Sequence, residues 1–261
     1  MEYYSGNAIY ELIKNQQLSN CIFTTGRMWF LVYADKSTEP LVLILLSEKS
    51  DDVEYKSNNL STEENAFIPF AKEISRLTSV PLIYVCFNSK SKPISDVVVS
   101  SDFINFKKMG MEDYIHYINR FGPVFGTVAT KKEINDKYSN VYQVWQNQHG
   151  GIATGSDIDL MITSKDGEIH TIFELKRSFF QLEDWKPYRQ DFHNFEVIYN
   201  LLRSTNIHFY IMYNRRTKKP FFDDASKVRL FKIESSNPLR YTDKGTFDTL
   251  LLLRNPEKYN L

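Results

Sequence analysis

Two stretches that otherwise have the character of buried strands carry charged residues close together. The first is Gly155–Ile162 and the second is Ile169–Ser178, and the segment between them ends in Asp166-Gly167. An Asp-Gly pair between two apolar runs is typical of a hairpin turn, so we expect two antiparallel strands here. Side chains along a strand alternate between its faces. The sequence therefore predicts that charged side chains gather on one face of a hairpin.

The charged residues of this hairpin are Asp159, Glu174 and Lys176, with Asp157 close by. Glu174 and Lys176 share a strand face, about 6–7 Å apart along the strand, and Asp159 lies within cross-strand reach. Two adjacent carboxylates repel unless a cation lies between them, and oxygen ligands of this kind suit Mg²⁺ or Mn²⁺ better than zinc. Lys176 is placed to orient or deprotonate an attacking water and to offset charge in the transition state. The implied chemistry is metal-assisted phosphodiester hydrolysis.

Asp159, an apolar strand and then Glu174-Leu175-Lys176 fifteen positions later resemble the PD-(D/E)xK nuclease superfamily, over about residues 130–235. The resemblance implies a restriction-endonuclease-like mixed sheet flanked by helices. It also implies that Asp159 and Glu174 bind the metal, that the Leu175 carbonyl is a further ligand, and that Lys176 is the catalytic lysine. The proline of the motif's name is absent, since Ile158 precedes Asp159.

Each half of this motif also has a structural interpretation. An Asp at a strand start is often only a turn residue, and Glu-x-Lys on a strand is often a solvated edge. Asp157 is either a second carboxylate at the metal, on the face of Asp159, or a solvated turn residue. The spacing and the hairpin together favour a nuclease-type site.

Composition places few limits on function. The 261 residues are 42% hydrophobic and 25% charged, which is ordinary for a soluble globular protein and provides ample core. We found neither a membrane span nor a signal peptide in the sequence, so a cytoplasmic protein is expected. Cys21 and Cys86 lie among apolar residues and are expected to be buried thiols. The net charge of zero argues against a protein that coats nucleic acid.

The order of elements is repeated along the chain. A strand pair, a helix and a strand at 28–88 are matched by a similar series at 158–214, at an offset of about 125–129 residues, which suggests an internal duplication. The alternative is that any two α/β units share such a rhythm. With duplication, Asp159, Glu174 and Lys176 correspond to Phe30, Leu45 and Ser47, which cannot bind a metal. We therefore expect two α/β domains, 1–125 and 126–261, with the first an inactive repeat that serves in substrate binding or dimerisation.

Several residues are candidates for contacts to nucleic acid, in two groups. A basic run, expected to be a loop after a strand at 207–213, contains Arg215, Arg216, Lys218 and Lys219. Arg189 and Gln190 precede a helix near the catalytic strand. Between these groups, the loop 178–185 carries Phe179, Phe180 and Trp185, which either stack on bases or cover the core. Glu133 or Asp136, on an earlier helix, is a further candidate acid, with capping or solvent exposure as the alternative.

The sequence thus predicts an Mg²⁺-dependent endodeoxyribonuclease, Mn²⁺ being a substitute, that serves restriction-modification or defence involving mobile DNA. The fold class alone does not choose the biological process. Alternatives are an RNA-directed nuclease, a nucleic-acid-binding protein on a retired nuclease fold, or a subunit that cuts only with a partner. DNA is the expected partner, and either a homodimer or a pseudo-dimer by duplication would allow double-strand cutting.

Overall fold

The structure is a computed structural model that describes residues 7–24, 27–50, 60–127, 129, 140–218, 221–259 and 261. It is a mixed α/β protein with two six-stranded mixed sheets and, among the described residues, six α-helices. The chain forms two compact units: unit 1 comprises 1–23 and 158–261, and unit 2 comprises 24–157. No described helix is long and apolar enough to cross a membrane.

Unit 1 contains sheet A, with strand order β1-β8-β9-β10-β11-β12. Its only parallel pair is β9–β10, and α6 forms the crossover between these strands. The elements of unit 1 are α1 (Ala8–Asn15), β1 (Cys21–Ile22), β8 (Leu160–Thr163), β9 (Ile169–Ser178), η2 (Arg189–Asp191), α6 (Phe192–Leu202), β10 (His208–Lys218), β11 (Phe221–Ser235), β12 (Arg240–Asp248), α7 (Thr249–Arg254) and η3 (Pro256–Tyr259).

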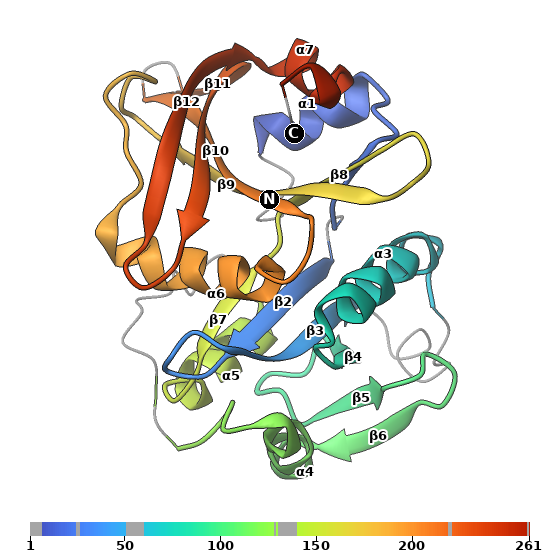
Figure 1. Cartoon of the computed structure of the whole chain (residues 1–261). Helices are drawn as coiled ribbons and strands as arrows, with labels where there is room; N and C mark the ends of the chain where they lie inside the picture. Colours follow the sequence, from blue (N-terminus) through green and yellow to red (C-terminus); the bar gives the residue numbers. More distant parts are fainter. Residues whose placement is uncertain are drawn as a thin grey trace. The chain divides into compact units, whose positions relative to one another are not determined.

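Both faces of sheet A are covered in unit 1, by different helices (Figure 1). On one face, Ile9 and Ile13 of α1 and Leu252 of α7 pack with Phe173 and other buried strand residues. The opposite face is covered by α6 and by the loop that follows β9. Because side chains alternate along β9, Phe173 and Leu175 face α1, while Glu174 and Lys176 face α6.

Unit 2 contains sheet B, with strand order β6-β5-β4-β3-β2-β7. Its only parallel pair is β3–β4, with α3 as the crossover. Its elements are β2 (Met28–Ala34), β3 (Pro40–Lys49), α3 (Thr62–Thr78), β4 (Leu82–Asn88), β5 (Asp96–Ser100), β6 (Lys107–Gly110), α4 (Met111–Ile118), η1 (Asn119–Phe121), α5 (Val141–His149) and β7 (Thr154–Asp157).

The helix α3 begins with a capping box formed by Ser61 and Glu64. Ser61 accepts a hydrogen bond from the Glu64 main chain, and the Glu64 side chain accepts one from the Ser61 N–H. This capping box satisfies two N–H groups that the first helical turn leaves without partners.

The two sheets repeat one pattern of pairing. In each, an edge strand and a hairpin are antiparallel, the next pair is parallel, and the last two pairs are antiparallel. The hairpins correspond residue by residue: a shift of 129 residues converts Tyr33 opposite Val42 into Ile162 opposite Thr171, and both hairpins have a bulge directly after this pair. Related structures keep their β-bulges at equivalent positions, so a bulge at the same place in both hairpins indicates a common origin. This agreement favours internal duplication.

Each sheet takes its edge strand from the segment that precedes the other hairpin. The first arm, α1–β1, precedes β2 in the chain, but β1 pairs with β8 in sheet A. The second arm, α5–β7, precedes β8, but β7 pairs with β2 in sheet B. The compact units therefore differ from the expected division into 1–125 and 126–261, because each half of the chain contributes a short arm to the sheet of the other half.

Candidate active site on strand β9

Glu174 and Lys176 form an ion pair on the face of sheet A that α6 covers. The Lys176 Nζ lies 2.8 Å from Glu174 Oε1 and 5.5 Å from the centre of the Phe195 ring on α6. Glu174 is buried, whereas the Lys176 side chain is 25% exposed. The sequence prediction that these two side chains share a strand face thus agrees with the structure.

Lys176 is held in its charged form. Burial alone would lower the pKa of its amine, but the negative charge and hydrogen bond of Glu174, together with the charges of Asp159 and Asp191, raise the pKa above its ordinary value. Lys176 is therefore an ammonium ion over the whole neutral range. As an ammonium ion, Lys176 can orient a water and offset negative charge; to abstract a proton it must first lose its own, which a cation bound at Glu174 and Asp159 would favour.

Asp159 lies at the edge of β9, where β8 has ended. The β8–β9 ladder stops at Leu160, which pairs with Phe173, and the buried Asp159 carboxylate then accepts a hydrogen bond of 2.7 Å from the Leu175 N–H. In an extended strand, the N–H and C=O groups of one residue point to the same side. The Leu175 carbonyl therefore points to the edge where the Asp159 carboxylate lies.

Two residues near this site were not identified from the sequence. Tyr10 of α1 donates a hydrogen bond of 3.0 Å to the Asp159 carbonyl, and its ring stacks on Phe23. Asp191, at the start of α6, acts electrostatically on Lys176. Tyr10 is separated from Asp159 by almost 150 residues, so only the exchanged arm could have revealed it. Asp191 directly follows Arg189 and Gln190, the two residues predicted to contact nucleic acid.

Asp157 does not share a strand with Asp159. It is the last residue of β7 and lies opposite Leu31 in sheet B, whereas Asp159 belongs to unit 1. The expected single strand across Gly155–Ile162 is wrong, because the chain leaves one sheet at Asp157 and enters the other at Leu160. The expectation that both aspartates occupy one face fails with it.

The basic run after residue 213 continues a strand and does not form a loop. Asn214 to Lys218 extend β10, with Arg215 opposite Asp224 and Arg216 opposite Asp223. Asp223 is within 2.6 Å of Arg177 and 3.7 Å of Arg216. Lys219 lies outside the described residues.

The remaining polar candidates lie at the start of α6 and on an earlier segment. Arg189 and Gln190 are exposed in the turn η2, next to Asp191. Glu133 and Asp136 lie outside the described residues.

The three aromatic residues after β9 divide between surface and core. Phe179 and Phe180 are 45% and 54% exposed. Trp185 is buried and stacks on Tyr213 of β10, with ring centres 4.3 Å apart. Trp185 therefore covers the core, and only Phe179 and Phe180 remain accessible for stacking.

The donors at the β9 edge fit a hard divalent cation of modest affinity. They are the carboxylates of Asp159 and Glu174 and the Leu175 carbonyl. The described part of the chain contains no cluster of three or more His, Cys, Asp or Glu residues able to hold a metal. Mg²⁺ commonly takes one or two protein carboxylates and keeps several waters, while zinc prefers His and Cys.

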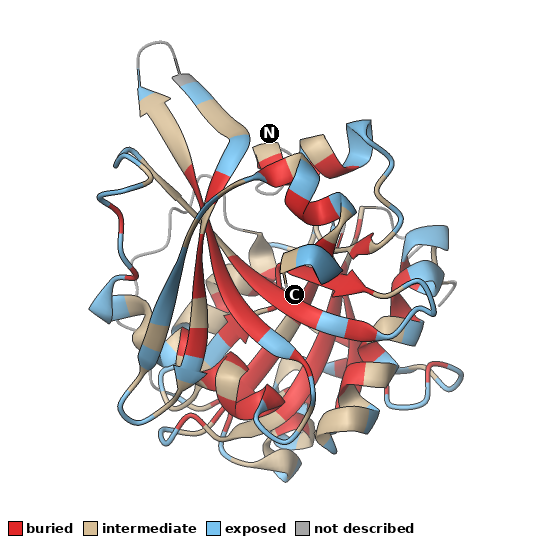
Figure 2. Ribbon diagram, turned by 45° about the horizontal axis from the view of Figure 1, so that its top comes forward, coloured by how far each residue is buried: buried red, intermediate tan, exposed pale blue. Residues whose placement is uncertain are grey.

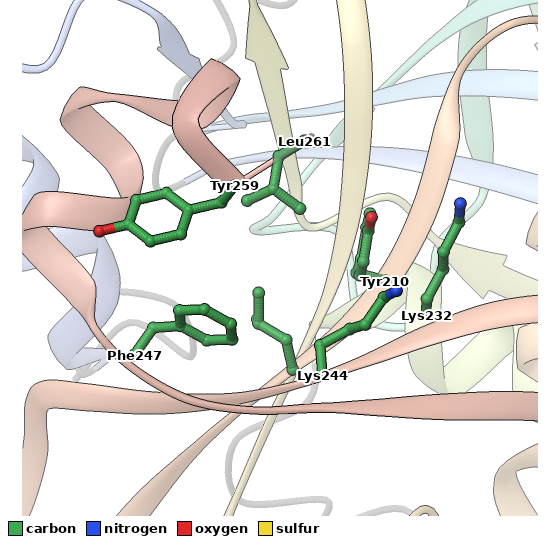
Figure 3. A pocket seen from close by; sticks show the side chains of 7 residues that line it. Tyr210, Lys232, Lys244, Phe247, Tyr259 and Leu261 are labelled. Atoms are coloured by element: carbon green, nitrogen blue, oxygen red, sulfur yellow. The ribbon is translucent and has the colours of Figure 1, made fainter.

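A shallow pocket lies on the other face of sheet A. Its lining includes Tyr210 and Leu230, which pack with the α1 face, and the amines of Lys232 and Lys244 (Figure 3). No Asp or Glu side chain is among the described residues that line the pocket, so it lacks the pair of side-chain carboxylates found at the β9 edge.

Comparison with known proteins gives no family. No family model matches the chain, and no curated protein matches it. Among solved structures, the sex pheromone precursor from Lactobacillus salivarius subsp. salivarius is 10% identical over 87% of this chain and 71% of that chain, with a TM-score of 0.17. The sex pheromone staph-cAM373 precursor is 8% identical over 93% of this chain and 91% of that chain, with a TM-score of 0.15. At such scores neither likeness carries an argument about fold or function.

Proposed function

We propose that the chain is a metal-dependent endonuclease that hydrolyses DNA phosphodiester bonds at the β9 edge, in a restriction-endonuclease-like unit 1. One observation carries the proposal: three charged residues converge on one strand edge, among buried apolar residues. They are Asp159, Glu174 and Lys176. Ionisable groups with perturbed pKa values that gather where one of them reaches solvent, as Lys176 does, are typical of a functional site.

Asp159, Glu174 and the Leu175 carbonyl would hold Mg²⁺ or Mn²⁺. Such an ion supplies a Lewis acid for a phosphate oxygen and lowers the pKa of a bound water. The chain's own residues prepare this site. The Leu175 N–H fixes one oxygen of Asp159, and Tyr10 fixes the Asp159 main chain, so the carboxylate is oriented before any ligand arrives.

Lys176 acts in this proposal as a positioned cation. Its ammonium lies beside Glu174 and offsets negative charge that grows on the phosphoryl oxygens in the transition state. Because its pKa is raised, its pairing stabilises the folded protein at all pH values below the ordinary lysine value of 10.5. That contribution is lost only as the pH rises through the higher folded pKa.

One observation favours a second candidate, a nucleic-acid-binding protein without catalysis. The Glu174–Lys176 ion pair already balances one carboxylate without a metal. In that case metal would be dispensable and binding would survive the loss of Glu174.

The test is cleavage of plasmid DNA, with single-stranded DNA and RNA in parallel, in Mg²⁺, Mn²⁺ or EDTA. The variant is Lys176→Met and the matched control is Lys165→Met, in the exposed hairpin turn. We expect metal-dependent cutting that falls by a factor of about 10²–10³ in Lys176→Met, the usual loss for one electrostatic group. Equal rates for both variants would refute the assignment, and preference for RNA would replace the DNA substrate. Failure to cut any substrate would leave the second candidate.

A further inference from the structure

Strands β10 and β11 form a two-stranded ribbon that continues sheet A beyond the candidate site. The ribbon projects from the sheet in Figure 2, with tan and pale-blue residues on both strands. Pairing connects it to the site: Lys176 lies opposite Tyr213, and Ser178 lies opposite Arg215. Paired residues share a face, so Arg215 is on the face of Glu174 and Lys176.

Alternation separates the basic residues of the ribbon into two sets. Arg216 and Lys218 point to the opposite face from Arg215. There Arg216 approaches Asp223, and the Lys218 Nζ lies 4.6 Å from the centre of the Phe179 ring. On the site face, the Arg215 Nε is buried and has no hydrogen-bond partner among the described residues. Arg215 as a whole is partly exposed, so its guanidinium group can still meet a phosphate at the surface.

Exposed aromatic rings flank Arg215 on the site face. Phe222 is opposite Thr217, which shares the face of Arg215, and is 57% exposed. The main chain of Phe180 is held on the same face by a hydrogen bond of 2.8 Å from the Tyr213 hydroxyl to the Phe180 carbonyl, and the Phe180 side chain is 54% exposed. From Lys176 to Arg215 and on to Phe222, the steps along the ribbon are about 7 Å each, two residues of strand.

We propose that Arg215, Phe180 and Phe222 form a binding strip for an unpaired nucleic-acid strand, with phosphate on Arg215 and bases stacked on the two rings. This inference rests on the proposed function, and it names the substrate as single-stranded or locally unpaired. Cations recognise the phosphate backbone, and every unpaired base offers a face to an aromatic ring. In an intact duplex the base faces are stacked on one another and cannot reach Phe180 or Phe222.

Binding is measured by fluorescence anisotropy in EDTA, so that cleavage plays no part. The probes are a labelled oligothymidylate and a duplex of equal length. Phe222→Ala, Phe180→Ala and Arg215→Gln are compared with Phe179→Ala and Lys218→Gln, which remove one aromatic ring and one cation on the opposite face. Melting temperatures identify any variant that fails to fold.

We expect the wild-type chain to prefer the single strand, and each site-face variant to bind it about tenfold more weakly. The opposite-face variants should remain within twofold of wild type. Equal binding by all variants, or tighter binding of the duplex, would overturn the inference while metal-dependent cleavage could still stand. If Lys176→Met loses cleavage but binds the single strand as wild type does, the catalytic site and the binding strip are separate. No binding of either probe by the wild-type chain would overturn this inference, and the cleavage assay would then decide the proposed function alone.

Discussion

Equivalent hairpins in the two units hold opposite kinds of chemistry. The shift of 129 residues that relates them places Phe30 and Leu45 of unit 2 where unit 1 has Asp159 and Glu174. Phe30 and Leu45 are fully buried, and Phe30 packs edge-on against Phe67 of α3. The same backbone therefore supports an apolar core in one unit and a pair of carboxylates in the other.

Unit 2 also has a charged cluster, the closed cluster, in which side chains of unit 2 already donate hydrogen bonds to the carboxylate. Glu64, at the start of α3, is 2.7 Å from the buried Lys49 amine, and it accepts hydrogen bonds from Tyr84, at 2.8 Å, and from Ser47. Burial would raise the pKa of Glu64, but these hydrogen bonds together lower it. A carboxylate with this many donors has little capacity for a metal. The comparison shows that solvent access and acceptor capacity, not charge alone, distinguish a candidate site from a structural cluster.

The largest effect should follow from separating the repeats. When residues 1–135 and 136–261 are expressed as two chains, each fragment carries the edge arm of the other repeat's sheet. An open sheet edge and an exposed helix-binding face favour aggregation, so neither fragment should be soluble alone. Together they should purify as a 1:1 complex. Soluble, folded single fragments would contradict the exchange of arms.

Breaking the closed cluster should destabilise the protein strongly. Glu64→Ala leaves the Lys49 amine buried without a carboxylate, and such changes cost about 3–5 kcal/mol. Glu174→Gln should change the free energy of unfolding by about 1 kcal/mol or less, because the partly exposed Lys176 can be hydrated. Urea unfolding of both variants measures the difference. Comparable losses would show that the β9 cluster is also structural.

Acid should reduce the stability of the protein through Glu64 of the closed cluster. Since the folded pKa of Glu64 is lowered, its stabilising contribution is present above the ordinary value of 4.5 and is lost as the pH falls through the folded pKa. The unfolding temperature should therefore fall as the pH is lowered from 5 to 3. Glu64→Gln should reduce this dependence, and an unchanged pH profile in that variant would contradict the assignment.

The smallest effect should come from the hydroxyl that holds Asp159. Tyr10→Phe removes one hydrogen bond to a main-chain carbonyl, a loss of about 1 kcal/mol. Tyr199→Phe is a matched control, since its hydroxyl donates to the Glu234 carbonyl at 2.8 Å. We expect Tyr10→Phe alone to raise the Mn²⁺ concentration needed for half-maximal cleavage several-fold. Equal metal requirements in both variants would limit Tyr10 to a purely structural role.

Local signals in the sequence predicted much of the fold. Asp166-Gly167 marked the β8–β9 hairpin, and Gly167 indeed adopts φ +82°. Ser61 and Glu64, three residues apart, form the capping box at the start of α3, a pattern that is also local in the sequence. Cys21 and Cys86 are buried thiols, as expected. Each of these features depends on neighbours within a few residues, which is why a sequence pattern can reveal it.

Features set by distant residues were missed. The exchange of arms depends on which hairpin β1 and β7 pair with, and that choice leaves no local pattern; it explains both the misplaced domain boundary and Asp157. The extension of β10 through Lys218 depends on pairing with β11. The candidate site was found because Asp159, Glu174 and Lys176 violate the apolar pattern locally, whereas Tyr10 and Asp191 obey theirs.

We expect the β9 edge to bind a divalent cation and the Glu64–Lys49 cluster of unit 2 not to bind one. Mn²⁺ binding is measured by isothermal titration calorimetry on wild-type protein, Glu174→Gln and Glu64→Gln, at a temperature where all three are folded. We predict binding to wild type that Glu174→Gln abolishes and Glu64→Gln retains. Equal binding by wild type and Glu174→Gln, or no Mn²⁺ binding by the wild-type chain, would show that the β9 edge is not a metal site.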